Sequence, residues 1–330
     1  MTSTAPPGVA READPGPGRL ALHRRRAAEY ALAAATLVLV AIFASIAPGF
    51  LSVANAVNIA LSIAIVGILA VGMSAVILTG GIDLSIGSVL ALAGVAAAIV
   101  ATRGAPFIVV LLVALGVGAL TGVVNGSLIA YLRVPPFVAT LAMLTAARGL
   151  SFIISEGRSI GGLPPWFGSL GRTVVFGIPA PVLVMGAVMA GGAVVLSRMV
   201  FGRHIYALGG NAQAAWLAGI RVKHVTWLVY TLNGTLAGLG GLVLASRLGA
   251  GVPNAGVQYE LDVIAAVVVG GTSLSGGRGS IGSTLWGTVF IGVLTNGLNL
   301  ANVDPYVQKI ALGVVIVIAV IADGLGRRHA

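Results

Sequence analysis

Asp83 is the residue whose type and position point most directly to chemistry. It lies in residues 78–88, LTGGIDLSIGS, between two apolar runs long enough to cross a bilayer. A charge at membrane depth costs about 2.5 to 3.5 kcal/mol on insertion scales, so it usually faces protein or a water-filled path. If the preceding span begins near Val57, Asp83 instead lies in a turn at the membrane surface. A place in a translocation pathway and a place in a surface turn therefore both stay open.

A second glycine-rich stretch repeats this pattern. Residues 270–283, GGTSLSGGRGSIGS, contain the same GGxxLS and IGS elements. Glycine adopts backbone conformations that end helices, and short, glycine-interrupted apolar segments are the best sequence indicators of a transport site. We therefore predict helix breaks at residues 80–83 and within residues 270–279, both facing one pathway. Chance similarity is the alternative to a true repeat, because an inverted repeat would place the two copies on opposite sides of the membrane.

Hydroxyl and amide side chains inside the apolar runs extend the candidate pathway. Such groups let a neutral solute pass without holding it tightly, whereas each is equally consistent with a hydrogen bond between helices, worth about 0.6 kcal/mol on average. The candidate set for the pathway is Asp83, Ser85, Asn125, Thr140, Asn296 and Asn299.

Arg148 and Asp262 are charged residues inside predicted spans. Arg148 lies about 18 Å of helix beyond Pro136, where its span is entered from the cytoplasm. Its guanidinium needs either an acidic partner or a route for its charged end to the membrane surface. Asp262 is the nearest acidic candidate by depth. We predict that these two residues pair, with snorkelling of Arg148 as the alternative.

Missing residue types exclude several other kinds of chemistry. The chain has no cysteine, which excludes disulfides, thiolate metal sites and thiol catalysis. Its four histidines lie in basic or loop stretches, so no metal site is predicted. Neither of its lysines, Lys223 and Lys309, follows a glycine, so the phosphate-binding pattern GxxxxGK[ST] is absent. We therefore expect no ATPase site, no bound cofactor and no enzymatic activity.

The composition indicates that helices in lipid position these residues. Hydrophobic residues make up 58% of the chain and charged residues 8%, and the mean hydropathy is +1.04, which leaves too little polar surface for a soluble globule. We predict an all-α polytopic membrane protein with about ten transmembrane helices. Glycine pairs at GxxxG spacing, such as Gly122/Gly126 and Gly234/Gly238, predict close helix packing. The predicted spans are residues 30–48, 57–79, 84–101, 106–131, 136–155, 180–197, 223–245, 258–272, 281–301 and 305–322.

The distribution of basic residues supports this count independently. Thirteen of them lie in segments that would face the cytoplasm and four in outward loops, which satisfies the positive-inside rule and places both termini in the cytoplasm. The net charge of +10 therefore needs no nucleic-acid partner. The inward residues are Arg11, Arg19, Arg24, Arg25, Arg26, Arg133, Arg198, Arg203, Arg221, Lys223, Arg278, Arg327 and Arg328, and the outward residues are Arg103, Arg158, Arg172 and Arg247.

One transmembrane domain, residues 27–324, is predicted between a disordered basic tail, residues 1–26, and a short cytoplasmic tail, residues 325–330. Two extramembrane segments are long enough to have a function. The outer one, residues 156–179, combines proline and aromatic residues with glycines, which suits a rigid cap or a loop packed on its own bundle. The inner one, residues 198–222, is predicted to hold a short helix that begins at Asn211 as N-cap. Such a helix is either a membrane-surface element or a docking element for a partner.

A family resemblance becomes visible in this inner segment. FGRHIYALGGNAQAAWLAGIRV resembles the cytoplasmic loop of permease subunits in ribose-, xylose- and arabinose-type ABC sugar importers. ILTGGIDLSIGSVLAL, GVVNGSLIAYLRVPPFVATLAMLTAARGL and VVVGGTSLSGGRGSIGSTLWGTVFIGVLTNGLNL resemble further parts of the same subunits in the same order. The resemblance implies a permease for a monosaccharide or similar small polar solute. The implied partners are a second permease copy, a cytoplasmic ABC ATPase that uses ATP and Mg²⁺, and a periplasmic or lipid-anchored sugar-binding protein.

The resemblance also implies that the inner segment contacts the ATPase. A face of small residues, Ala212, Ala215 and Gly219, would fit a groove of that partner. Family members often carry charged residues after the asparagine, where this chain has Ala212, Gln213 and Trp216, so docking by shape is expected. The implied coupling residues are Gly202, Arg203, Gly209, Asn211, Ala215 and Gly219. A secondary transporter or channel is the alternative function, although it usually needs more intramembrane carboxylates or histidines.

Overall fold

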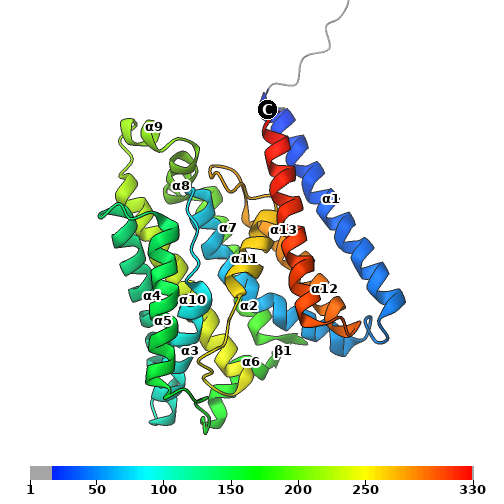
Figure 1. Ribbon diagram of the computed structural model, residues 1–330, viewed down its shortest axis with the longest axis vertical. Helices are drawn as coiled ribbons and strands as arrows, with labels where there is room; N and C mark the ends of the chain where they lie inside the picture. Colours follow the sequence, from blue (N-terminus) through cyan, green and yellow to red (C-terminus); the bar gives the residue numbers. More distant parts are fainter. Residues whose placement is uncertain (1–16, 329–330) are drawn as a thin grey trace, which may run out of the picture.

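Ten helices of the described chain coincide with the ten predicted spans (Figure 1). The computed structural model describes residues 17–328, with side chains for residues 31–321. The ten helices are α1 (Pro17–Ile46), α2 (Val53–Leu78), α3 (Ile86–Thr102), α4 (Phe107–Ala130), α5 (Pro136–Ile154), α7 (Ala180–Arg198), α10 (Val222–Leu248), α11 (Tyr259–Val269), α12 (Ile281–Leu300) and α13 (Pro305–Arg328). The other elements are the 3₁₀ helix η1 (Pro165–Gly168), α6 (Ser169–Arg172), β1 (Val174–Val175), β2 (Ile178–Pro179), α8 (Val200–Gly210) and α9 (Ala212–Leu217).

The helices are those of an all-α polytopic membrane protein. Within the described residues, six helices are long and apolar enough to cross a membrane, namely α2, α4, α5, α7, α10 and α12. Shorter apolar helices are formed by α3 and by parts of α1 and α13. Helix α11 has 11 residues, about 16 Å of helix, so it cannot cross a hydrocarbon core of about 30 Å by itself. Ten crossings stay a prediction.

Both predicted helix breaks are confirmed. Helix α2 ends at Leu78 and α3 begins at Ile86, and Gly80 between them has a φ of +79°. Helix α11 ends at Val269 and α12 begins at Ile281. Positive φ angles occur in the second break at Gly271, Gly276, Gly277 and Gly279. This left-handed backbone strongly favours glycine, which explains why the glycine pairs marked both breaks in the sequence.

Glycines bring α4 and α10 into direct backbone contact. A Cβ atom at Gly118 or Gly122 would collide with the backbone of α10, and a Cβ atom at Gly234 or Gly238 would collide with the backbone of α4. The close packing that GxxxG spacing predicts is therefore confirmed. Helices α2, α3 and α10 form the most buried part of the bundle, whereas α1 and α13 lie at its side (Figure 1).

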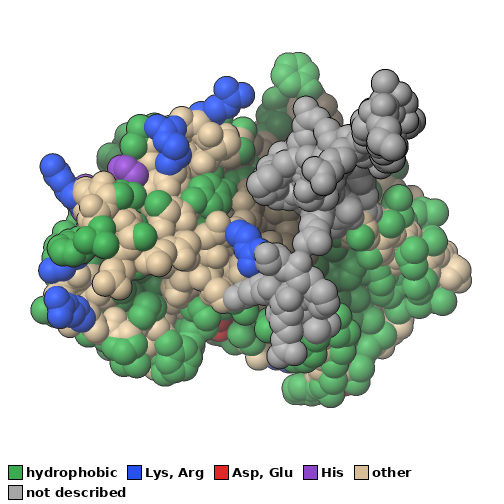
Figure 2. All heavy atoms as spheres, turned by 90° about the horizontal axis from the view of Figure 1, so that it is seen from above, with side chains coloured by type: hydrophobic (Ala, Val, Ile, Leu, Met, Phe, Trp, Pro, Cys, Tyr) green, Lys and Arg blue, Asp and Glu red, His purple; other side chains and the backbone are tan. Residues whose placement is uncertain are grey.

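The segments predicted to face the cytoplasm lie at one end of the molecule. Figure 1 shows α8, α9, the start of α1 and the end of α13 at the upper end, and α6 and β1 at the lower end. Figure 2 looks onto the upper end and shows several Lys and Arg side chains on the left half of the view. The exposed basic residues of the inward segments are Arg133, Arg198, Arg203, Arg221, Lys223 and Arg278. This arrangement fits the predicted orientation.

Helix α1 extends into the predicted disordered tail. It begins at Pro17, and α13 likewise continues into the predicted C-terminal tail as far as Arg328. Residues 19–29 contain many Leu, Ala and Arg, which favour helices, and no Gly or Pro interrupts the chain from Arg19 to Ala47. The rest of both predicted tails, residues 1–16 and 329–330, lies outside the described residues.

The outer segment, residues 156–179, packs on its own bundle. Phe167 is buried against side chains of α4 and α10. The Ser246 hydroxyl of α10 donates a hydrogen bond to the Phe167 carbonyl (2.5 Å) and accepts one from the Gly171 N–H (2.7 Å). The antiparallel pair β1–β2 follows, and Phe176 at its turn is fully exposed. The segment is thus a cap held to α10 by hydrogen bonds, with the apolar side chain of Phe176 exposed at its turn.

The α4–α10 contact generates a stability prediction. In Gly118→Val, the added side chain must push the α10 backbone away, and such overpacking costs about 1–3 kcal/mol or more. Gly116→Val on the same helix is the matched control, because no atom lies within 4 Å of a Cβ at that position. Thermal unfolding of the purified variants in detergent should show a lower Tm for Gly118→Val alone. Equal Tm values would contradict the contact.

Candidate functional site

Asp83 is the centre of a buried hydrogen-bond network in the first helix break. Its side chain is 2% exposed. Oδ1 accepts hydrogen bonds from the Ser85 N–H (2.8 Å) and the Ser85 hydroxyl (2.6 Å), and Oδ2 accepts one from Asn233 Nδ2 (2.8 Å). Asn125 Nδ2 in turn donates to Ser85 Oγ (3.1 Å). The carboxylate therefore joins the break to α4 through Asn125 and to α10 through Asn233.

The surroundings of this network are polar as well as buried. Thr140 donates a hydrogen bond to the Pro136 carbonyl of its own helix (2.9 Å) and lies 3.4 Å from the Ile82 carbonyl of the break. Asn125 Oδ1, Asn233 Oδ1 and the Tyr230 hydroxyl are buried and have no hydrogen-bond partner among the described residues. Buried waters usually satisfy such atoms. Four of the six pathway candidates, Asp83, Ser85, Asn125 and Thr140, thus lie together inside packed protein.

The two helix breaks touch each other. The Gly277 N–H donates a hydrogen bond to the Leu78 carbonyl at the end of α2 (2.9 Å). A Cβ atom at Gly276 would lie 2.9 Å from the Leu78 carbonyl oxygen and 3.0 Å from the Gly80 nitrogen. The backbones of the two glycine-rich segments are therefore in contact, which is compatible with the expectation that both breaks face one pathway.

Helix α8 packs against the point where the breaks meet. A Cβ atom at Gly209 would collide with the Leu78 carbonyl and would crowd the Gly277 nitrogen. On the preceding turn, the Tyr206 hydroxyl donates a hydrogen bond to the Gly279 carbonyl (2.9 Å). Three segments that are far apart in the sequence thus meet through main-chain atoms. We name this contact, made by Leu78, Gly209 and Gly277, the three-segment junction.

Helix α9 follows α8 and differs in part from its predicted role. Asn211 caps it as predicted, because its Oδ1 accepts a hydrogen bond from the Ala214 N–H (2.9 Å). Ala215 is only 4% exposed, however, since this side of the short helix packs on the protein itself. Ala215 therefore does not present its side chain to a partner, contrary to the expected small-residue face. Trp216 and Leu217 are 66% and 73% exposed instead.

The other predicted coupling residues, Gly202, Gly219 and Arg203, differ in burial and backbone conformation. Gly202 is buried and lies so close to the end of α7 that a Cβ atom would collide with the backbone there. Gly219 has a φ of +82°, which favours glycine at the turn after α9. The Arg203 side chain is exposed on α8.

Arg148 does not form the predicted ion pair with Asp262. Its NH1 donates hydrogen bonds to the Pro253 carbonyl (2.8 Å) and the Ala255 carbonyl (2.9 Å). The connection between α10 and α11 folds over α5 and offers these oxygens, and Glu260, not Asp262, is the acidic residue whose charge acts on the guanidinium. Ser151 also donates to the Pro253 carbonyl (3.3 Å). Arg148 therefore fastens this outer connection to α5.

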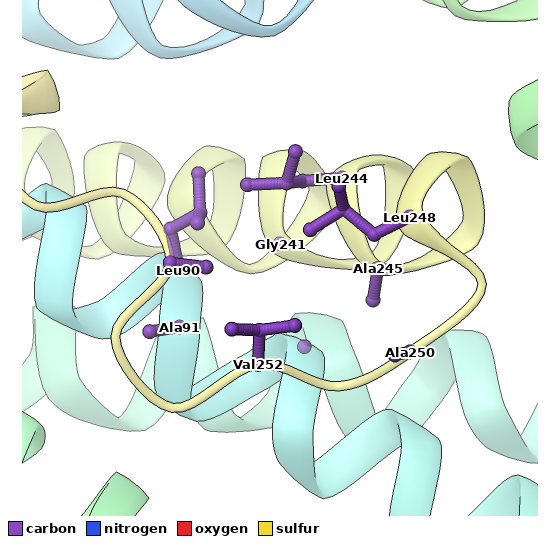
Figure 3. Close-up of a pocket in the computed structure, with 10 residues that line it drawn as sticks. Leu90, Ala91, Gly241, Leu244, Ala245, Leu248, Ala250 and Val252 are labelled. Atoms are coloured by element: carbon purple, nitrogen blue, oxygen red, sulfur yellow. The ribbon is translucent and has the colours of Figure 1, made fainter. Parts of the chain in front are cut away.

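Asn296 and Asn299, the other two pathway candidates, lie at a cavity instead. They line a cavity of about 170 Å³ between the middle of α2, the first turn of α11 and the second half of α12, together with Asp262. By contrast, the cavity between α3, α10 and the following connection is apolar and measures about 10 Å³ (Figure 3). A volume this small is at the limit for one water molecule. The Asn296 and Asn299 cavity is thus the better candidate for a solute.

Several residues of these sites were not predicted from the sequence. Asn233 and Tyr230 lie in an apolar run. The amide side chain of Asn233 within that run could have marked it as a candidate from the sequence. Tyr259 and Gln308 border the outer cavities, but nothing in their local sequence distinguishes them from ordinary residues at helix starts.

The Asp83 network generates the next prediction. Asp83→Ala leaves the Ser85 N–H, the Ser85 hydroxyl and the Asn233 amide without their acceptor, at about 1–3 kcal/mol for each unpaired group. Thr140→Val is the control within the same buried region, because Thr140 bonds mainly to its own helix. Thermal unfolding and folded yield should fall strongly for Asp83→Ala and little for Thr140→Val. Similar small effects would mean that the network does not hold the break.

Comparison with known proteins identifies the family. Residues 55–320 match the family described as "Branched-chain amino acid transport system / permease component". The chain is 45% identical over 293 residues to the ribose import permease protein RbsC of Haemophilus influenzae, covering 88% of this chain and 91% of that protein. It is 44% identical over 296 residues to RbsC of Escherichia coli K12, with the same coverage. It is 38% identical over 200 residues, 61% of either chain, to the L-arabinose transport system permease protein AraH of Escherichia coli K12. No solved structure matches the chain. The chain therefore belongs to this family of transport-system permease components.

Proposed function

We propose that this chain is the permease subunit of an ABC importer and forms the pathway for a monosaccharide or a similar small polar solute. The similar proteins are named as permeases for ribose, L-arabinose and D-allose. The chain also lacks the GxxxxGK[ST] pattern of a phosphate-binding loop. Energy for import must therefore come from a separate ATPase, which uses ATP and Mg²⁺.

The proposed assembly contains a second copy of the chain and two further kinds of partner. The subunit crosses a bacterial inner membrane ten times, with both termini in the cytoplasm. The ATPase docks at the end that carries α8 and α9, and a periplasmic or lipid-anchored sugar-binding protein docks at the end that carries α6 and β1 (Figure 1). The positive-inside rule supports this orientation, because the exposed Arg and Lys side chains of the inward segments lie at the α8–α9 end.

The three-segment junction is the observation that carries the proposal. An element that receives work from an ATPase needs a stiff connection to the parts of the pathway that move. Gly209 supplies this stiff connection. Its backbone lies directly against the Leu78 carbonyl and the Gly277 nitrogen, with no side chain between α8 and the two breaks. The Tyr206 hydrogen bond to Gly279 adds a second attachment to the same break. A displacement of α8 therefore reaches both breaks at once.

Helix α9 supplies the docking surface for the ATPase. Trp216 and Leu217 form an exposed apolar knob beyond the membrane-spanning helices. Large aromatic side chains that fill a pocket are typical binding hot spots. Closure of two ATPase subunits would then pull on α9, move α8 and alternate the access of the pathway between the two sides of the membrane.

The junction predicts a loss of coupling in Gly209→Ala. The added methyl group pushes α8 away from the two breaks, with a strain of about 1–3 kcal/mol. ATP-driven sugar uptake into vesicles should fall, whereas the ATPase still co-purifies because α9 is unchanged. Gly210→Ala is the control, since no atom lies within 4 Å of a Cβ at the neighbouring glycine. Normal uptake in Gly209→Ala would remove the junction from the mechanism.

The apolar knob predicts a loss of assembly in Trp216→Ala. Truncation of an aromatic hot spot costs about 2 kcal/mol or more in binding, which is roughly a thirtyfold weaker complex. Co-purification of the ATPase should drop, and the Tm of the permease alone should stay unchanged because the side chain is exposed. Phe176→Ala removes a fully exposed aromatic side chain at the opposite end and serves as control. An intact complex with Trp216→Ala would place the docking surface elsewhere.

A further inference from the structure

We infer that the middle of α2, the first turn of α11, the second half of α12 and the first half of α13 form a binding site for a neutral, polyhydroxylated solute in transit. This inference rests on the proposed function. Two adjoining cavities lie there. One, of about 170 Å³, is bordered by α2, α11 and α12, and the other, of about 250 Å³, by α11, α12 and α13. Asp262 and Thr295 border both cavities.

The cavities are large enough for a small organic solute. A cavity of about 10–15 Å³ holds a single water molecule, so each of these spaces exceeds that requirement many times. They are bordered by the first turn of α11, the first half of α13 and the second half of α12, away from α8 and α9 (Figure 1). In the proposed orientation, these parts of the helices face the outer side of the membrane.

The walls offer both donors and acceptors for sugar hydroxyl groups. Asn296 Oδ1 is buried and has no hydrogen-bond partner among the described residues. Gln308 Nε2 donates to Asn299 Oδ1 (2.9 Å) and to the Val303 carbonyl (2.9 Å), which leaves Asn299 Nδ2 and Gln308 Oε1 unused by the described part of the chain. The Asp262 carboxylate also forms no hydrogen bond with described residues. The unpaired, buried Asn296 Oδ1 is costly, and a hydroxyl group of a ligand that donates to it removes that cost.

The rest of the lining favours a neutral sugar over an ion. Ile63, Val66 and Ile291 give the first cavity an apolar side for the C–H face of a sugar ring, and Tyr259 adds an amphipathic side chain. Asp262 and Lys309 both border the second cavity. Because they carry opposite charges, neither an anion nor a cation is attracted by the whole lining.

Helix α11 connects this site with the three-segment junction. Its first turn carries Tyr259 and Asp262 at the cavities, and its last residue, Val269, precedes the second break. Close backbone packing against α12, where a Cβ at Gly287 would collide with the Ala266 carbonyl, holds the two helices together. A movement of the break therefore shifts one wall of the solute site.

Cysteine labelling tests the site directly, because the chain contains no cysteine. Asn296→Cys and Asn299→Cys are made in the full-length permease, expressed with its ATPase and binding protein, and are labelled with a small water-soluble maleimide. D-ribose, L-arabinose and D-allose are the probes. A transported sugar should lower the labelling rate at both positions. Ser159→Cys, in an exposed stretch of the outer segment, should label equally with and without sugar.

Uptake measurements provide the second readout. Asn299→Leu removes the polar wall, and loss of one or two hydrogen bonds to the sugar should lower the kcat/KM of uptake by about tenfold. Thr145→Leu is the control, because Thr145 is an exposed residue of α5 that bonds only within its own helix. Size-exclusion profiles check that the variants fold. If Asn299→Leu does not fold, Asn296→Ala replaces it in the uptake measurement.

The two readouts separate this inference from the proposed function. If wild-type uptake depends on ATP but no sugar protects either cysteine and the variants transport normally, the site is wrong and the importer assignment stands. If sugars protect both cysteines and the variants lose uptake, the site is right, even where wild-type uptake proves independent of ATP and the importer assignment fails.

Discussion

The Leu78 carbonyl needs a hydrogen-bond donor, and this requirement organises the centre of the structure. The last carbonyls of a helix have no partner within the helix, and Leu78 is buried inside the protein, where an unpaired carbonyl is costly. The donor is the Gly277 N–H, almost two hundred positions later in the chain. A contact between two main chains requires glycine on the approaching segments, so Gly209 and Gly276 follow from the same constraint. Ending α2 inside the protein thus fixes the second break and α8.

Polar groups inside the bundle divide into two kinds according to their surroundings. Around Asp83 the groups bind one another within packed helices, so they hold a break in place and leave little room for a solute. Around Asp262 and Asn296 the helices separate enough to leave space between them. The first arrangement makes the first break and its neighbouring helices one rigid unit, and the second leaves an adaptable outer wall.

The sequence allowed accurate prediction of features that depend on local backbone chemistry. Glycine pairs located both breaks, Asn211 identified a helix start, and hydropathy located ten helices. Features that depend on tertiary contacts were predicted less well. Arg148 binds backbone carbonyls, which every residue carries, so no side-chain pattern could indicate them. Ala215 faces inward because of how α9 folds back, and a six-residue helix has too little periodicity to reveal its buried side.

The three-segment junction is made by main-chain atoms, so it offers no side chain that could recognise a particular partner. In the proposed assembly, recognition of the ATPase depends on the exposed residues of α9, which lie outside the junction. Substitutions on that surface would then change which ATPase the permease accepts and leave the main-chain contacts of the junction intact.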